Sequence, residues 1–232
     1  MNRPLRDEFA GWIAEREWDV ALLQEAPPLW FHELARSARA NGRRVLTSRN
    51  LIPPLQRFLA NLSPDLIASW EGGSNQLLVR DPGRVLEHRT MTLATTPERR
   101  KMTWARVRLA SGQTVCVVNL HASAGLPEQA SGEVLGAAAS AVGWSGGDPL
   151  VFGGDLNLRP ERTPAVFREL RTRFDLGDPT APGAIDHVLA RGLDVMEPPR
   201  RLPPEERELP AEGGRRLRLS DHAPVIARFE VE

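Results

Sequence analysis

The stretch Val151–Asn157, with the sequence VFGGDLN, decides how we interpret the fold. Its apolar start is typical of a buried strand, and two glycines then lead into Asp155 and Asn157. Residues i and i+2 of an extended backbone point to the same side, so we expect these two side chains to lie together at the strand's carboxyl end. A carboxylate that moves a proton, beside an amide that orients a water, suits hydrolysis. The same residues are also typical of a turn that closes a buried strand.

Composition limits the class of protein. The 232 residues, 41% of them hydrophobic, are enough to bury a full core and are compatible with one large domain or two small ones. The formal net charge is zero, so no overall field attracts a polyanion. Cys116 is the sole cysteine, which excludes disulfides within the chain and argues against a cysteine-ligated zinc site. Without an apolar run of about 18 residues or an N-terminal signal region, we expect a cytoplasmic protein with no membrane span.

Hydrophobic periodicity and turn signals predict a mixed α/β chain. We expect helices at residues 5–16, 29–40, 55–62, 127–142 and 163–170, and strands at 18–25, 44–46, 76–80, 84–93, 104–109, 114–120, 184–190 and 225–231. Asn41-Gly42 is typical of the stop of the second helix. Ser111-Gly112-Gln113 joins two strands directly, which indicates antiparallel pairing as in a sandwich or meander. Residues 194–216 are rich in Pro, Glu and Arg without periodicity, so we predict an exposed loop insertion there.

Five polar clusters sit at or beside the ends of predicted strands. They are Glu25, Asn119 with His121, Asp155 with Asn157, Asp186, and Asp221 with His222. Gathered in space, the carboxylates could hold a hard divalent cation, because magnesium prefers oxygen ligands and takes one or two protein carboxylates. The histidines would then bind a phosphoryl oxygen or protonate a leaving group. By position alone, Glu25 suits a metal ligand and a helix-capping group equally well.

The motifs around these clusters resemble, in order and spacing, those of the endonuclease/exonuclease/phosphatase superfamily. They are Leu23-Gln24-Glu25, Asn119-Leu120-His121, Gly154-Asp155-Leu156-Asn157, Ile185-Asp186-His187 and Ser220-Asp221-His222. The resemblance runs from Val20 to the C-terminus, and Gly-Asp-x-Asn followed by a final Ser-Asp-His is its most specific part. It implies a single domain over residues 1–232 with an α/β fold: a four-layer α-β-β-α sandwich of two mostly antiparallel, DNase I-like sheets. It also implies a Mg²⁺ or Mn²⁺ site that hydrolyses phosphate esters.

The resemblance also implies roles for the metal-binding and water-binding residues. Glu25 would bind the metal, and Asp221 would support metal or water. Asp155 would orient or deprotonate the attacking water, which Asn157 would hold in place.

The same resemblance gives the histidines different roles. His222 would contact the scissile phosphate, and Asp186 would hydrogen-bond to it and fix its tautomer. His121 would protonate the leaving oxygen. His187 should point to the opposite face from Asp186, and we predict a packing or hydrogen-bonding role for it.

Three further residues are candidate substrate contacts: Asn75, Arg100 and Asn119. Asn75 lies where the family has a substrate-facing loop. Arg100 follows Arg99 in a segment that often carries a basic residue in the family, although the two arginines also suit a solvated charge pair. Asn119 has an alternative role as the cap of its strand.

The chain departs from the family pattern at its start. Members begin with a strand that ends in an asparagine of the metal site, but here the first predicted helix begins by Leu5. Asn2 is too close to the terminus to be held at a strand end. Either the true start lies upstream, where a targeting sequence could also lie, or the chain lacks a central strand and one site residue.

Three functions compete. The leading hypothesis is a monomeric metal-dependent phosphodiesterase or endonuclease that hydrolyses a phosphate ester, with nucleic acid as one candidate substrate. A phosphomonoesterase or lipid-headgroup phosphodiesterase is the alternative, because the chain has no net charge and no tyrosine for base stacking. The third is a catalytically silent scaffold, motivated by the absent asparagine. The retained carboxylates argue against silence, since an unused carboxylate cluster is electrostatically costly.

Overall fold

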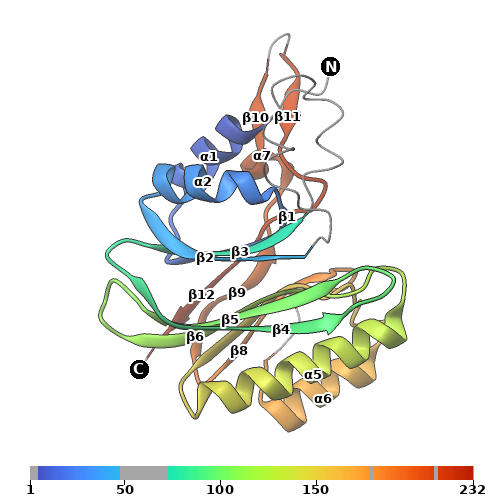
Figure 1. The fold of residues 1–232 in the computed structure, drawn as a ribbon. Coiled ribbons are helices and arrows are strands. Elements are labelled where there is room, and N and C mark those ends of the chain that lie inside the picture. The colour runs from blue at the N-terminus through green and yellow to red at the C-terminus, as the bar shows by residue number, and fades with distance from the viewer. Residues whose placement is uncertain (1–4, 48–72, 178–179, 212–213, 232) are drawn as a thin grey trace.

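The computed structural model describes residues 5–47, 73–177, 180–211 and 214–231, and it has four layers. Two sheets lie face to face, and helices cover both outer faces (Figure 1). The helices of the outer layers are α1 (Arg6–Glu15), α2 (Phe31–Ser37), α5 (Pro127–Ser145) and α6 (Pro164–Phe174), and a short 3-10 turn, η1 (Pro28–Trp30), precedes α2. The predicted four-layer α-β-β-α sandwich is confirmed.

The smaller sheet lies beneath α1 and α2 and has the strand order β1-β3-β2, with both pairings antiparallel. Its strands are β1 (Val20–Ala26), β2 (Ala40–Leu46) and β3 (Ser74–Arg80). The prediction that Asn41-Gly42 stops a helix is wrong, because α2 ends at Ser37 and these two residues lie inside β2. Gly42 serves strand pairing instead. A Cβ there would lie 2.0 Å from the carbonyl oxygen of Leu77, so only glycine allows the two strands to approach.

The larger sheet has the strand order β4-β5-β6-β7-β8. Its strands are β4 (Arg84–Ala94), β5 (Arg100–Arg108), β6 (Thr114–His121), β7 (Leu150–Asp155) and β8 (Asp186–Arg191). The hairpin predicted at residues 111–113 is confirmed, since β5 and β6 pair antiparallel. The pairing of β6 with β7 is parallel, and α5 forms the connection between them. This crossover places the carboxyl ends of two adjacent strands at the same edge of the sheet.

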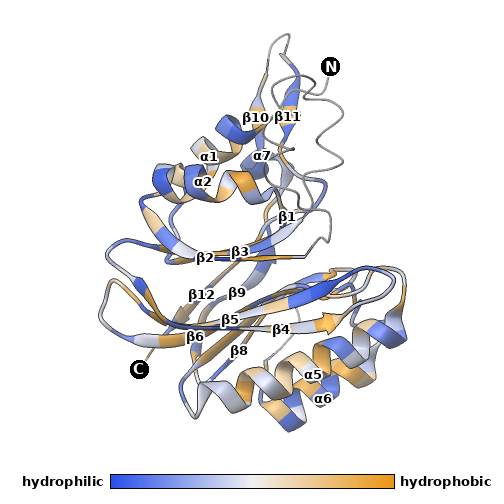
Figure 2. Cartoon of the chain, in the orientation of Figure 1, coloured by the Kyte–Doolittle hydropathy of each residue, from blue (hydrophilic) through white to orange (hydrophobic). Residues whose placement is uncertain are grey.

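Three apolar layers hold the sandwich together. Between the sheets, Leu77 and Val79 of β3 pack with Ala105 and Val107 of β5. A second cluster lies under α1 and α2, and the largest lies between the five-stranded sheet and the helices α5 and α6. Hydrophobic and hydrophilic residues alternate along these helices (Figure 2), as expected for elements that bury one face.

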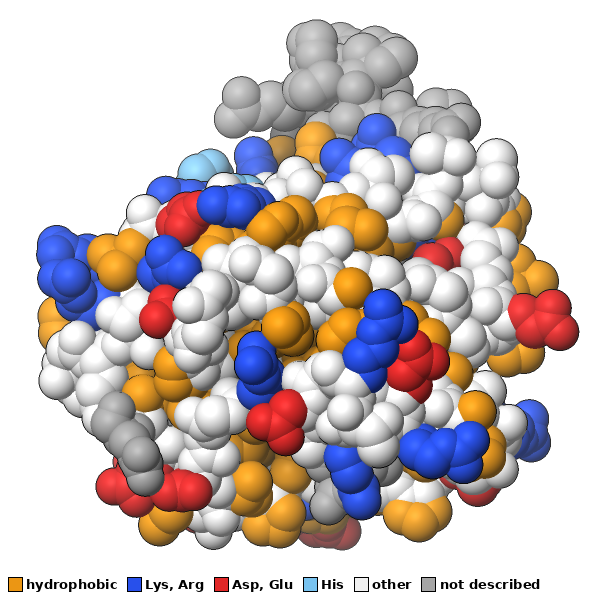
Figure 3. Space-filling view, turned by 90° about the horizontal axis from the view of Figure 1, so that it is seen from below, with side chains coloured by type: hydrophobic (Ala, Val, Ile, Leu, Met, Phe, Trp, Pro, Cys, Tyr) orange, Lys and Arg blue, Asp and Glu red, His pale blue; other side chains and the backbone are white. Residues whose placement is uncertain are grey.

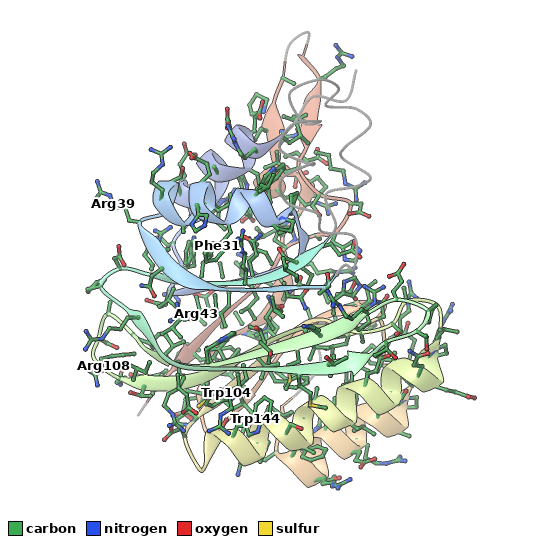
Figure 4. The ribbon with its side chains drawn as sticks, viewed as in Figure 1. Phe31, Arg39, Arg43, Trp104, Arg108 and Trp144 are labelled. Carbon is green, nitrogen blue, oxygen red and sulfur yellow. The ribbon has the colours of Figure 1, made fainter. Side chains whose placement is uncertain are left out.

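Two tryptophans anchor α5 to the larger sheet. Trp104 of β5 is fully buried and points toward the helix, where its ring meets Trp144 edge-on with 6.0 Å between the ring centroids (Figure 4). Its indole N–H donates to the hydroxyl of Ser145 over 3.3 Å. The helix is therefore fixed at its C-terminal end by both packing and a polar contact.

The prediction of an exposed loop at residues 194–216 is largely wrong, because most of this segment forms secondary structure. It contains β9 (Asp194–Arg201), α7 (Pro204–Arg207), β10 (Glu208–Pro210) and the start of β11 (Arg216–Arg218). β9 pairs with the last strand, β12 (Val225–Glu230), and β10 pairs with β11. The ladder of β9 is irregular between Glu197 and Arg200, which allows Pro198 and Pro199 to stand in a strand although they cannot donate hydrogen bonds.

Two predictions fall outside the described residues: the helix at 55–62 and the placement of Asn2. Within the described part of the chain, β1 pairs with β3 alone, so its other edge carries no partner strand there. None of the described helices combines the length and apolar character needed to cross a membrane. Seen from the side of α5 and α6, basic and acidic side chains are interspersed over the surface (Figure 3).

Candidate active site

Strand register brings the predicted catalytic groups to one end of the two sheets. His121, the last residue of β6, is the register partner of Asp155, the last residue of β7. Asp186, the first residue of β8, pairs with Asp155 from the other side. Glu25 near the end of β1 lies 3.5 Å from both His121 and Arg100, so the smaller sheet contributes to the same site.

Gly154 and Asn157 shape the backbone around Asp155. Gly154 has a φ of +134°, and a Cβ there would lie 2.0 Å from the carbonyl oxygen of Leu120, so this position requires glycine. The strand ends at Asp155, and Asn157 has a φ of +52°. The backbone therefore forms the turn that the sequence offered as the alternative interpretation. The backbone N–H of Asn157 donates to Oδ1 of Asp155 over 2.9 Å, and its side-chain amide donates to the carbonyl of Ala122 over 2.9 Å. The two polar groups are therefore joined by this turn and not by strand alternation.

Asp155 is a buried carboxylate, only 5% exposed. Burial raises its pKa to about 6, and the neighbouring charge of Asp186 adds to the rise, while the hydrogen bond from Asn157 opposes it. The carboxylate is ionised at neutral pH but holds a proton more readily than an ordinary aspartate. This is the property expected of a group that accepts a proton from water.

His222 and Asp186 form a hydrogen-bonded pair. Nδ1 of His222 lies 2.9 and 3.0 Å from the two carboxylate oxygens of Asp186. This bond raises the pKa of His222 to about 9, so the imidazole is positively charged at neutral pH. The pairing agrees with the orienting role predicted for Asp186.

Arg100 lies at the centre of a second group of contacts. Its side chain is 9% exposed, and Nη1 lies 3.1 Å from Nδ1 of His121 and 3.5 Å from Oε1 of Glu25. Burial, together with the positive charges of Arg100 and His222, lowers the pKa of His121 to about 3. His121 is therefore neutral, and its 3.5 Å approaches to Glu25 and Asp155 are not ion pairs. The role of leaving-group acid predicted for His121 fits the charged His222 better.

Sequence reasoning missed Glu98, whose carboxylate lies 2.7 Å from Nη2 of Arg100. The doublet Arg99-Arg100 drew attention to this segment, but no spacing distinguished a glutamate two residues earlier. The two arginines also separate: Arg99 donates to the carbonyls of Leu46 and Thr47, away from Arg100. Arg100 instead contacts His121 and Glu25.

The remaining predicted residues have mainly structural contacts. Asn119 is fully buried, accepts a hydrogen bond from Gln24 and donates to the carbonyls of Leu23 and Gln76, so its amide ties the two sheets together. These contacts favour the alternative to a substrate role. Asn75 is also buried and donates to the carbonyl of Lys101, next to Arg100, while its Oδ1 has no partner among the described residues.

His187 has the packing and hydrogen-bonding surroundings predicted for it. Its ring is buried against Phe167, with ring centroids 5.0 Å apart, and Nε2 lies 3.1 Å from the carbonyl oxygen of Leu158. Nδ1 accepts a hydrogen bond from the backbone N–H of Thr180. The side chain thus turns away from the Asp186 side of β8.

A divalent cation fits the donors of the catalytic cluster. Ligand atoms of Asp155, Asp186 and His222 all lie within 4.8 Å of one another, and the carboxylate oxygens are suitable ligands, whereas His222 in its protonated form has no free nitrogen lone pair to offer. The metal pair predicted from the sequence was Glu25 and Asp221. Glu25 borders the cluster through His121, whereas the exposed Asp221 is not brought into this three-residue group.

Comparisons with known proteins identify the family and the fold. The sequence profile of the Endonuclease/Exonuclease/phosphatase family matches residues 2–222. No curated protein sequence matches significantly. Among solved structures, the fold is similar to an endonuclease/exonuclease/phosphatase from Bacteroides vulgatus, with 20% identity over 98% of this chain and 90% of the other and a TM-score of 0.71.

Two further structures share the fold. A mannosyl-6-phosphatase from Bacteroides thetaiotaomicron has 15% identity and a TM-score of 0.70, over 99% of this chain and 95% of its own. TDP2 from D. rerio, complexed with a single-strand DNA product, has 16% identity and a TM-score of 0.67, over 97% of this chain and 91% of its own. With the family profile spanning nearly all of the sequence, the chain belongs to the endonuclease/exonuclease/phosphatase family.

Proposed function

We propose that the protein is a divalent-metal-dependent phosphodiesterase, with single-stranded nucleic acid as one candidate substrate. The observation that carries the proposal is the convergence of buried Asp155 with the His222–Asp186 pair within 4.8 Å. A proton acceptor and a charged imidazole then face the same small volume. Family members are phosphoester hydrolases, and the similar TDP2 structure contains a DNA product.

Each residue has a role that follows from its surroundings. Asp155 accepts a proton from the attacking water, which Asn157 orients with a side chain fixed by Ala122. His222 binds the phosphate as a cation and supplies a proton to the leaving oxygen, which a diester needs because its leaving group is an alkoxide. Arg100 offers a second positive charge to the phosphoryl oxygens.

A divalent metal would be held by the carboxylates whose charges lie near Asp155, those of Asp186 and Glu25, which would leave Asp155 to accept the proton. When bound, such an ion polarises the phosphoryl oxygen and offsets the charge that develops in the transition state. Mg²⁺ and Mn²⁺ are the ions proposed, since the donors are mostly carboxylate oxygens. Asp221 remains a candidate for supporting the metal or the water.

The test is hydrolysis by purified protein of single-stranded DNA, plasmid DNA, bis-p-nitrophenyl phosphate and p-nitrophenyl phosphate, with Mg²⁺, with Mn²⁺ and with EDTA. We expect metal-dependent cleavage of the diesters that EDTA abolishes. Asp155→Asn should lower the rate about 100- to 1000-fold, because losing one preorganised group of this kind has that effect. The matched control is Glu169→Gln, which alters an exposed ion pair on α6. Equal diester cleavage by wild type and Asp155→Asn would contradict the proposal.

A phosphomonoesterase is the second candidate function. Two positive side chains, Arg100 and His222, lie beside the same cluster, and this suits the dianion of a phosphate monoester. The similarity to a mannosyl-6-phosphatase points in the same direction. Preferential cleavage of p-nitrophenyl phosphate over the diesters would favour this alternative.

A further inference from the structure

Glu133, on α5, is a buried carboxylate that the proposed chemistry does not use. The residue is 7% exposed. Its oxygens accept hydrogen bonds from the backbone N–H of Ser123 over 2.8 Å, from the hydroxyl of Ser123 over 2.7 Å and from the amide of Gln129 over 2.8 Å. These partners are all neutral, and a buried charge is tolerated only where hydrogen bonds of this kind replace water.

The main partner of Glu133 belongs to the loop that leaves the active site. Ser123 lies two residues after His121, and Ala122 lies between them. The N–H of Ala122 donates to the carbonyl of Asp155 over 2.9 Å, and its carbonyl accepts the side-chain amide of Asn157 over 2.9 Å. The loop is thus held on one side by Glu133 and on the other by the end of β7.

Gln129 extends the network to the segment before Arg100. Its amide nitrogen donates to Oε1 of Glu133, lies 3.0 Å from the hydroxyl of Ser123 and donates to the carbonyl of Thr96 over 3.1 Å. Thr96 lies in the connection between β4 and β5, and Arg100 is the first residue of β5. Gln129 therefore connects α5 to two segments: the loop after His121 and the connection before Arg100.

We propose that Glu133 is a positioning residue of the active site, acting through Ser123 and Ala122 on His121, Asp155 and Asn157. The proposal rests on the proposed function for its catalytic consequence, but not for its structural part. A carboxylate accepts at both oxygens, whereas the amide of a glutamine presents N–H groups to donors. Glu133→Gln keeps the shape of the side chain but replaces one acceptor oxygen by an NH₂ group, which then faces a donor of Ser123 or Gln129.

The test combines kinetics with hydrogen–deuterium exchange on wild type, Glu133→Gln, Ser123→Ala and the control Glu128→Gln, an exposed glutamate on the same helix. In Glu133→Gln we expect kcat on the best diester substrate to fall about 10- to 100-fold with little change in KM, as when an outer partner of a site is lost. Amides of residues 121–123 and 155–157 should exchange faster, and those of α6 should not. Ser123→Ala, which loses one of the bonds, should show a smaller effect in the same direction, and Glu128→Gln should match wild type.

The two readouts separate the failure of this inference from failure of the proposed function. Faster exchange at 121–123 and 155–157 in Glu133→Gln supports the positioning role even where wild type cleaves none of the substrates. Unchanged exchange at those residues overturns it, as does a Glu133→Gln protein with wild-type kcat. A lowered melting temperature with wild-type kcat would indicate a merely structural role and also overturns it. Should Glu133→Gln fail to fold, Ser123→Ala decides by the same criteria.

Discussion

Asp155 and His222 lie in one cluster, yet their surroundings shift their pKa values in complementary ways. Burial raises the pKa of Asp155 to about 6, which leaves the carboxylate ionised at neutral pH. The hydrogen bond to Asp186 raises the pKa of His222 to about 9, which leaves the imidazole protonated. In the proposed mechanism, the proton acceptor and the proton donor are therefore both in their active forms between these two values. Different surroundings of two titratable groups are how a single site carries out both halves of acid–base catalysis.

The raised pKa of His222 predicts how stability depends on pH. Because the folded-state value, about 9, exceeds the unfolded value of 6.5, the protonated form stabilises the folded protein. This contribution is fully present below about pH 6.5 and is lost as pH rises toward 9. We expect the melting temperature of wild type to fall relative to that of His222→Gln across this window, with EDTA present to keep the site free of metal. A constant difference between the two proteins from pH 6 to 9.5 would contradict the Asp186–His222 pairing.

Single residues show what the sequence could and could not reveal about the site. Asp155, Asp186 and His222 lie at or near strand ends, in motifs whose order along the chain was recognised, and the structure brings them together. Asn119 occurs in an equally suggestive motif, but its side-chain amide forms hydrogen bonds to Leu23 and Gln76 of the other sheet. Glu133 carries no motif because its partner Ser123 lies outside its helix, and Glu98 carries none because a glutamate two residues before an arginine is common on any polar surface.

At the scale of elements, the close contact between β6 and β7 depends on one glycine. Gly154 has a φ of +134°, and any side chain there would meet the backbone of Leu120. Gly154→Ala should therefore lower the free energy of unfolding by at least about 2 kcal/mol, from backbone strain and from the displacement of β6. Urea unfolding provides the measurement.

The control for this substitution is Gly143→Ala. Gly143 lies in α5 with nothing within 4 Å of the added Cβ, so alanine there should raise stability by about 0.5 to 1 kcal/mol. Opposite signs for the two variants would assign the effect of Gly154→Ala to the strand contact. Similar small effects would show that β6 and β7 can separate without cost.

Elements with local signals were predicted better than those formed by distant pairing. The strand alternation and the turn at 111–113 identified β5 and β6 because neighbours in sequence pair with each other. β9 was missed because its partner, β12, follows only after three intervening elements, and because the two prolines of β9 argue against a strand. Gly42 misled the prediction, since a helix stop and a close strand contact both call for glycine.

At the scale of the whole molecule, the four layers follow from three separate apolar clusters. Periodicity alone identified amphipathic elements but left open how they stack. The four-layer sandwich was predicted from the family resemblance of the motifs. The same stacking explains why residues from β1, β5, β6, β7 and β8 reach one end of the molecule. The site is assembled by register between strands, so no single segment contains it.

Charge at the same scale predicts weak salt dependence of nucleic-acid binding. The chain has zero formal net charge, and basic and acidic side chains are interspersed on the face formed by α5 and α6 (Figure 3). Among the described residues, Arg100 and His222 are the positive side chains that we assign to the proposed site, so about two phosphates would be neutralised. For a single strand, the slope of log K against log salt concentration should then be about −1 to −2. This slope can be measured by fluorescence anisotropy of labelled single-stranded DNA with the Asp155→Asn protein at fixed Mg²⁺. A slope of about −4 or steeper would contradict the prediction and show that basic residues outside the site also bind the strand.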